Sequence, residues 1–162
     1  LNYKGESQSG SYSNKATSTI TLNSDVAEEV KLGGAKDTVD TNSSVDFMDS
    51  IVNFSLNATA DETDADDVVD TATSDAIDIE TAVDNTAGND KFVKNEESFS
   101  SLDAALLELA AKTVDGTQNI VFHAEGNTYL LAGDRDGELD SGDVLVELVG
   151  TYDLDLLLNV II

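Results

Sequence analysis

The feature that most constrains the fold of this chain is a long stretch without any positive charge. Lys36 and Lys91 bracket 54 residues that hold fifteen Asp and Glu side chains and no Lys or Arg. The whole chain carries 33 acidic and 8 basic residues, which gives a formal net charge of -25 at pH 7. Because such self-repulsion opposes a compact state, the chain needs counter-charges from outside in order to fold. Nucleic acids and anionic membrane surfaces are unfavourable partners for the same reason.

The composition nevertheless favours a folded domain over a disordered chain. Apolar residues make up 40% of the sequence and fall in periodic runs. The chain has no cysteine, so metal ions are the expected substitute for disulfides. No run of twenty apolar residues exists, and we expect no membrane insertion. A halophilic surface is an alternative source of acidity, but it would spread the acids evenly and not cluster them beside glycines.

Short β-prone runs dominate the chain and predict a mainly β fold. The runs expected to form strands are 19–22, 30–32, 37–39, 45–56, 91–93, 119–122, 128–131 and 144–149. One helix is expected near 101–112, because Ser100 or Ser101 can cap it and one apolar face follows. That face comprises Leu102, Ala105, Leu106, Leu109 and Ala110. Residues 1–17 are expected to be a linker or a frayed strand, and residues 18–162 one β module.

An acidic, glycine-containing loop joins the last two apolar runs and predicts a C-terminal β-hairpin with a metal site. Its predicted calcium ligands are Asp134, Asp136, Glu138, Asp140 and Asp143. Carboxylates that converge in a tight turn repel one another by several kcal/mol. A hard divalent cation, which takes six to eight oxygen ligands, removes that repulsion.

This loop can be aligned with a twelve-residue calcium loop in two registers. With Asp143 as the last ligand, Gly137 falls at the position that needs a sharp turn, but Ala132 takes the first ligand position. With Asp134 as the first ligand, the glycine is misplaced and Leu145 takes the last position. We prefer the first register, which predicts a site open to water. A solvated hairpin connection is the alternative.

Two other regions carry weaker metal-binding patterns. Three acids are spaced nine residues apart, the period of a calcium β-roll, and these are Glu28, Asp37 and Asp46. Val30 and Val39 share the same spacing. An ordinary glycine hairpin is the alternative for residues 32–39. A further acidic cluster comprises Asp61, Asp64, Asp66 and Asp67, for which the alternative is a solvated or disordered acidic loop.

Catalytic motifs are absent from the sequence. His123 is the only histidine, no cysteine can serve as a nucleophile, and no Gly-x-Ser-x-Gly elbow or zinc-binding histidine pair occurs. We therefore expect His123 to be a structural or surface residue, and we expect no enzymatic activity. Because the chain begins at Leu1 without a signal-peptide pattern, we expect a fragment or a processed C-terminal part of a longer protein.

Three pieces of the chain occur in a familiar order. They are the turn 33–38 leading into 48–54, the run 127–131 followed by the acidic loop and 142–150, and the segment 154–156 with its apolar continuation. Together they resemble the C-terminal region of bacterial calcium-binding proteins of the repeats-in-toxin class, which are exported by type I secretion. S-layer proteins, large adhesins and secreted hydrolases carry such a region. The resemblance covers roughly residues 18–162.

The resemblance implies a calcium-stabilised β-roll or β-sandwich-like module that folds on Ca²⁺ after export. It implies further calcium ligands in the glycine-rich turn and its continuation, namely Gly33, Asp37, Asp46 and Asp49. From the acidic cluster, Asp61, Asp64 and Asp66 are the remaining candidate ligands. Lys36 stands where the family has a glycine. It also implies that about residues 150–162 form an uncleaved secretion signal. A terminal core strand is the alternative, and both roles can hold together.

We therefore expect a calcium-dependent structural module of a secreted bacterial cell-surface protein, most similar to an S-layer protein. The expected partners are calcium ions, the type I secretion machinery, and further copies of the chain or other surface-protein domains. The alternatives are the C-terminal secretion and calcium-binding domain of an exported protease or lipase, and the terminus of an adhesin of the same class.

Overall fold

The computed structural model describes nine segments of the chain, residues 9–11, 18–22, 26–41, 44–59, 68–69, 74–79, 92–114, 119–133 and 138–162. Within them lie twelve strands: β1 (Ser9–Ser11), β2 (Ser18–Thr21), β3 (Glu29–Lys31), β4 (Asp37–Thr41), β5 (Asp49–Val52), β6 (Ala58–Thr59), β7 (Val68–Val69), β8 (Ala76–Ile79), β9 (Phe92–Phe99), β10 (Asn119–Ala124), β11 (Asn127–Ala132) and β12 (Val144–Leu148). They also contain two helices, α1 (Leu102–Val114) and α2 (Leu154–Leu157). The fold is mainly β, and this prediction from the sequence is confirmed.

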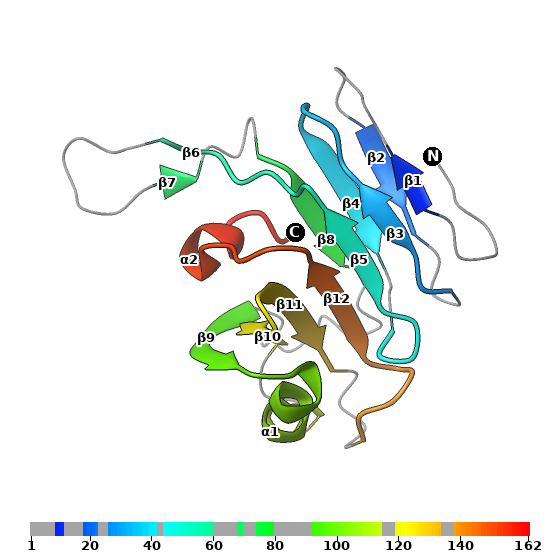
Figure 1. Cartoon of the computed structure of the whole chain (residues 1–162), viewed down its shortest axis with the longest axis vertical. Helices are drawn as coiled ribbons and strands as arrows, with labels where there is room; N and C mark the ends of the chain where they lie inside the picture. The colour runs from blue at the N-terminus through cyan, green and yellow to red at the C-terminus, as the bar shows by residue number, and fades with distance from the viewer. Residues whose placement is uncertain are drawn as a thin grey trace.

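The first half of the chain is a coil that alternates between two sheets (Figure 1). Strands β1, β3 and β5 run parallel to one another in a seven-stranded sheet. Strands β2, β4 and β8 run parallel in a three-stranded sheet. Each turn of the coil therefore contributes one strand to each sheet, which is the connectivity of a parallel β-roll. The small hairpin of β6 and β7 is inserted between β5 and β8.

The repeat of this coil is longer than the nine-residue spacing suggests. Ser9 pairs with Glu29, and Glu29 pairs with Ser50, so equivalent positions in the large sheet are 20 or 21 residues apart. Val30 and Val39 lie on consecutive strands of different sheets and are both buried. The nine residues from Val30 to Val39 thus correspond to half a turn of the coil. This nine-residue spacing is not repeated in the turns that follow.

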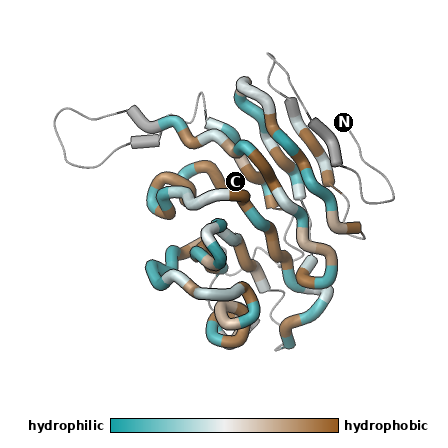
Figure 2. Tube along the Cα trace, viewed as in Figure 1, coloured by the Kyte–Doolittle hydropathy of each residue, from teal (hydrophilic) through white to brown (hydrophobic). Residues whose placement is uncertain are grey.

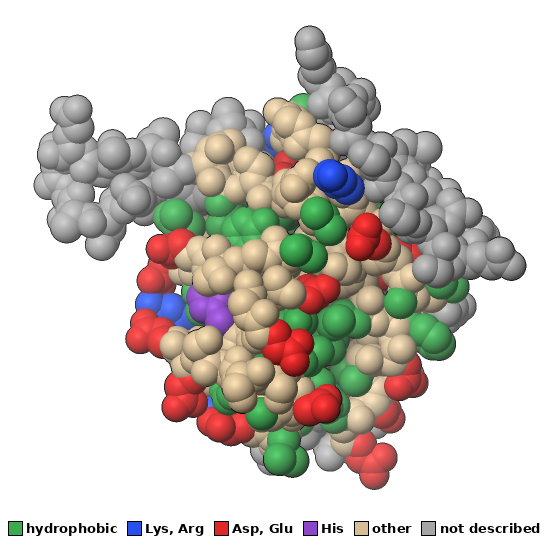
Figure 3. Space-filling view, viewed as in Figure 1, with side chains coloured by type: hydrophobic (Ala, Val, Ile, Leu, Met, Phe, Trp, Pro, Cys, Tyr) green, Lys and Arg blue, Asp and Glu red, His purple; other side chains and the backbone are tan. Residues whose placement is uncertain are grey.

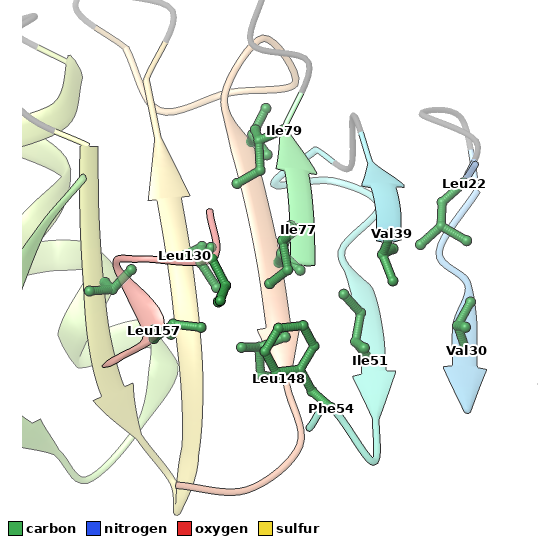
Figure 4. Close-up of a cluster of buried hydrophobic side chains, with 14 of the residues drawn as sticks. Leu22, Val30, Val39, Ile51, Phe54, Ile77, Ile79, Leu130, Leu148 and Leu157 are labelled. Atoms are coloured by element: carbon green, nitrogen blue, oxygen red, sulfur yellow. The ribbon is translucent and has the colours of Figure 1, made fainter. Parts of the chain in front are cut away.

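Alternating side chains hold the two sheets of the coil together, as expected for strands with one buried face. In β4 the first, third and fifth residues are buried and the two between them are half-buried. Val30, Val39 and Ile51 belong to one hydrophobic cluster between the sheets (Figure 4). The hydropathy of the coil strands accordingly changes from residue to residue along the chain (Figure 2).

The second half of the chain extends the large sheet beyond β5. Strand β12 pairs parallel with β5, β11 pairs antiparallel with β12, and β10 pairs antiparallel with β11. Strand β9 pairs parallel with β10 and is the edge strand of the large sheet. Glu125 and Gly126 form the two-residue turn between β10 and β11, both at positive φ (54° and 83°), as tight hairpins require. The predicted C-terminal β-hairpin is β11 with β12.

Helix α1 covers the second face of this extension. Ala105 and Leu109 are fully buried against a cluster that includes Phe122 and Tyr129. Leu107, on the opposite side of the helix, is 86% exposed. The Ser101 hydroxyl oxygen accepts a hydrogen bond from the Ala104 amide, as expected of a capping residue. The predicted helix and its apolar face are confirmed.

The last twelve residues, 151–162, pack onto the small sheet, and we refer to them as the strap. The Asp153 side chain accepts hydrogen bonds from the amides of Asp155 and Leu156 and so caps α2. Three strap residues are buried in the cluster between the sheets, Leu154, Leu157 and Val160. Ile161 forms a single parallel bridge with Ile77. The apolar tail is therefore part of the core, as one turn of helix and a bridge in place of a strand.

Candidate functional site

Part of the predicted calcium loop forms a tight acidic turn just before β12. The Asp140 amide donates to Asp143 Oδ2 at 2.8 Å, and the Gly142 amide donates to Asp140 Oδ1 at 2.7 Å. Asp143 is buried, whereas Asp140 and Glu138 are exposed. Each of the two aspartates thus uses one oxygen to hold the turn. The predicted ligands Asp134 and Asp136 lie outside the described residues.

A loop from the coil lies against this turn. The Val45 amide donates to the Asp143 carbonyl oxygen at 3.0 Å, although the two residues are far apart in the sequence. Phe47 and Ser44 exchange backbone hydrogen bonds that close the loop, and the exposed Asp46 lies within it. We call Asp46, Glu138, Asp140 and Asp143 the acidic corner. This backbone hydrogen bond places the Asp46 loop beside the Asp140 and Asp143 turn.

The other predicted ligands lie apart from the acidic corner or outside the described residues. Asp49 is fully buried, and its carboxylate accepts from the Glu28 amide at 3.0 Å and from the Thr41 hydroxyl at 2.8 Å. Asp37 is also buried, at the start of β4. Gly33 is half-buried in the connection between β3 and β4. The predicted ligands outside the described residues are Asp61, Asp64 and Asp66.

One buried structural carboxylate, Asp75, was not predicted from the sequence. It is fully buried and accepts from two amides, those of Asp37 at 2.8 Å and Ser55 at 2.7 Å. The pKa of its carboxyl is raised from 3.8 to about 6, chiefly by burial and also by the nearby charge of Asp37. The two amide hydrogen bonds and Lys36 act in the opposite direction.

Asp49 and Asp75 repeat one contact in the two sheets of the coil. Each carboxylate accepts the amide of the residue stacked on it one turn earlier, Glu28 for Asp49 and Asp37 for Asp75. All four acids stand at the start of a coil strand or directly before it. This position is the signal in the sequence that could have identified Asp75. The buried carboxylates therefore join successive turns of the coil.

Glu147 is the centre of another polar cluster, on the large sheet. Its carboxylate accepts from the hydroxyls of Ser50 and Tyr129 and from the Asn127 side-chain amide, at 2.7 to 2.9 Å. Burial, together with the hydrogen bond to Glu147, raises the pKa of Tyr129 to about 12. Ser50 lies on β5 and Tyr129 on β11, so this cluster ties the coil to the hairpin through β12.

His123 lines a shallow pocket of about 240 Å³ near the strap. Its Nε2 atom lies 2.9 Å from the Tyr152 carbonyl oxygen. Lys94 also lines the pocket and bridges Asp155 at 2.7 Å and Glu96 at 2.9 Å, and these two partners raise the pKa of its ammonium group. Figure 3 shows the histidine, in purple, beside basic and acidic side chains. No Ser, Thr or Cys is among the residues that line this pocket.

Among the described residues, no three His, Cys, Asp or Glu side chains are arranged to hold a metal ion. No helix in these segments is both long and apolar enough to cross a membrane. No protein-family model matches the sequence, and no curated protein is significantly similar to it.

Proposed function

We propose that this chain is a calcium-dependent structural module of a secreted bacterial cell-surface protein, similar in role to an S-layer domain. The observation that carries the proposal is a parallel two-sheet coil built by a chain with a formal net charge of -25. Neighbouring strands of a sheet lie about 4.8 Å apart, so acids at equivalent positions of successive turns come close together. The positive charge that offsets this repulsion comes from solution.

The acidic corner is where we place the ion. Its two loops offer carboxylate and carbonyl oxygens, the hard ligands of which Ca²⁺ takes six to eight. Asp134 and Asp136, which lie outside the described residues, are the further ligands that the sequence predicts. An ion at the corner links a loop of the coil to the β11–β12 hairpin, where the Val45 amide already bonds the Asp143 carbonyl. Calcium then stabilises the contact between the two halves of the large sheet.

This proposal assigns the chain a structural and not a catalytic role. Calcium is scarce inside cells and abundant outside, so the module folds after export by the type I secretion machinery. Its partners at the cell surface are other domains of surface proteins or further copies of the same chain. The strap belongs to the folded module and also carries the acidic-then-apolar pattern of the secretion signal in the family that the sequence resembles.

The test compares two double variants of equal charge. Asp136→Asn with Asp140→Asn removes two charges from the proposed site, whereas Glu97→Gln with Glu108→Gln removes two from exposed positions on β9 and α1. We expect the first to raise the calcium concentration at the folding midpoint about tenfold, because calcium affinity follows the number of charged ligands. The second should lower it slightly by relieving repulsion. Circular dichroism follows folding in both.

Equal midpoints for the two double variants would contradict the proposed site. That result would mean that cations act on this chain only by general screening of its charge, as in a halophilic surface. A midpoint that rises for the variant in the acidic loop and not for the surface variant supports an ion bound at the acidic corner.

A further inference from the structure

The outer edge of β8 is closed by two segments from elsewhere in the chain. The Asp75 amide bonds the Ser55 carbonyl, and the amides of Ile77 and Ile79 bond the carbonyls of Val160 and Ile162. The Ile162 amide returns a bond to the Ile77 carbonyl at 2.8 Å. The strap therefore covers an edge that would otherwise present unpaired backbone groups to another strand.

The strap holds this position by a small number of separable contacts. Leu157 is fully buried in the cluster between the sheets, where Figure 4 shows it among the other apolar side chains. Asp155 bonds Lys94 on β9, and the Tyr152 hydroxyl donates to the Phe54 carbonyl at 3.0 Å. Each contact joins one strap residue to one site on the body of the protein. A second copy of the chain offers the same sites in the same arrangement.

Gly150 sets the direction in which the strap leaves the body. Its φ is +116°, a conformation that residues with a side chain rarely adopt. The Gly150 amide donates to Asn127 Oδ1 and its carbonyl accepts from the Thr128 hydroxyl, so the glycine is anchored to β11 on both sides. The chain turns back onto its own body at this point. An extended hinge at the same position would carry the strap away from it.

We propose that the strap is exchangeable, so that residues 151–162 of one copy dock on β8 and Lys94 of a second copy. The occupant is a second copy of this chain because the segment already seated on the edge is the strap itself. In an exchanged dimer the strap forms the same contacts that it forms in the monomer. Exchange is therefore a low-cost route to a dimer. Gly150 is the hinge that favours the closed, monomeric form. The inference requires the folded chain but does not depend on where calcium binds.

The first test changes the hinge. Gly150→Val strains the closed form but not an extended hinge, so we expect it to raise the dimer fraction at a given concentration about tenfold. Gly126→Val is the matched control, because Gly126 has a φ of +83° but lies in the β10–β11 turn, and the substitution keeps its carbonyl oxygen, which accepts from the Thr151 hydroxyl of the strap. Size-exclusion chromatography with light scattering, in saturating calcium, measures the result. A monomeric Gly150→Val protein, or equal dimerisation of the Gly126→Val protein, would overturn the proposal.

The second test uses the ion pair between the strap and the body. Lys94→Glu alone and Asp155→Lys alone each place like charges together in a closed monomer or a homodimer. Mixed, the two proteins regain opposite charges at both docking sites of an exchanged heterodimer. We expect the mixture to form more dimer than either protein alone, both with the native hinge and with Gly150→Val. If mixing adds no dimer with either hinge, strap exchange does not occur.

Discussion

Replacing Asp49 with alanine is expected to lower the free energy of unfolding by about 3 kcal/mol or more, at a fixed calcium concentration. Asp49 is fully buried and accepts from the Glu28 amide and the Thr41 hydroxyl, which are themselves buried. Without the carboxylate both donors lose this acceptor inside the protein, and each loss costs about 1 to 3 kcal/mol. Urea unfolding at constant calcium measures the difference.

The control for this substitution removes one negative charge from the surface. Glu97→Ala, on the exposed edge strand β9, should change stability by no more than about 0.5 kcal/mol. Asp49→Asn keeps one acceptor oxygen and should fall between Asp49→Ala and the unchanged protein. If Asp49→Ala is as stable as Glu97→Ala, the bond between successive turns of the coil does not stabilise the fold.

Lowering the pH from 7 to 4 is expected to stabilise the fold through Asp75. Its folded-state pKa, about 6, lies above its ordinary value of 3.8, so the native state binds the proton more tightly than the unfolded chain. Stability from this group is therefore gained as the pH falls through 6 and is complete below 3.8. The full gain is about 3 kcal/mol, because one pKa unit corresponds to about 1.4 kcal/mol.

Asp75→Asn isolates this contribution from the general relief of charge repulsion. The groups that face Asp75 are Asp37, Lys36 and Tyr152, and the substitution leaves all three in place. We expect the unfolding free energy of the Asp75→Asn protein to vary less with pH between 4 and 7, measured by urea unfolding in the same buffers. Identical pH profiles for the two proteins would show that Asp75 does not titrate in this range.

Local patterns predict several individual elements of this fold, although they did not predict β8 or α2. The alternation of Val30 and Leu32 places β3, the four-residue apolar spacing predicts α1, and the turn-rich acidic loop between two apolar runs predicts the β11–β12 hairpin. Each of these features is decided by residues close together in the sequence. Hydrophobic periodicity and capping residues therefore carry enough information to locate them.

The pairing of distant strands could not be predicted in the same way. β4 pairs with β8 across the β6–β7 insertion, and β12 pairs with β5, because the core selects these neighbours and local preference does not. The sequence predicts a strand at 91–93, but β9 extends to Phe99 because β10 pairs along it with a register shift between Val121 and His123. The alternative of a terminal core strand for the strap was only partly right, because the strap forms one helical turn, α2, and a single bridge to Ile77.

Only part of the candidate site could be predicted from the sequence, because the rest depends on how distant strands pair. The Asp140 and Asp143 turn follows from a local pattern of acids and glycines, whereas its contact with the Asp46 loop depends on how β5 and β12 pair. Asp75 resembles the many other acids in the sequence until the coil places it inside the protein beside Asp37. Burial separates a structural carboxylate from a solvated one, and burial is a property of the whole fold.

The central claim is that external Ca²⁺ supplies the positive charge that this chain lacks. The most direct measurement follows circular dichroism and hydrodynamic radius while Ca²⁺ is added to chelated protein at constant ionic strength, with Na⁺ as the control cation. Our account predicts that Ca²⁺, and not Na⁺, contracts the chain and increases the β signal. A chain that is already compact and rich in β structure in chelator would contradict it.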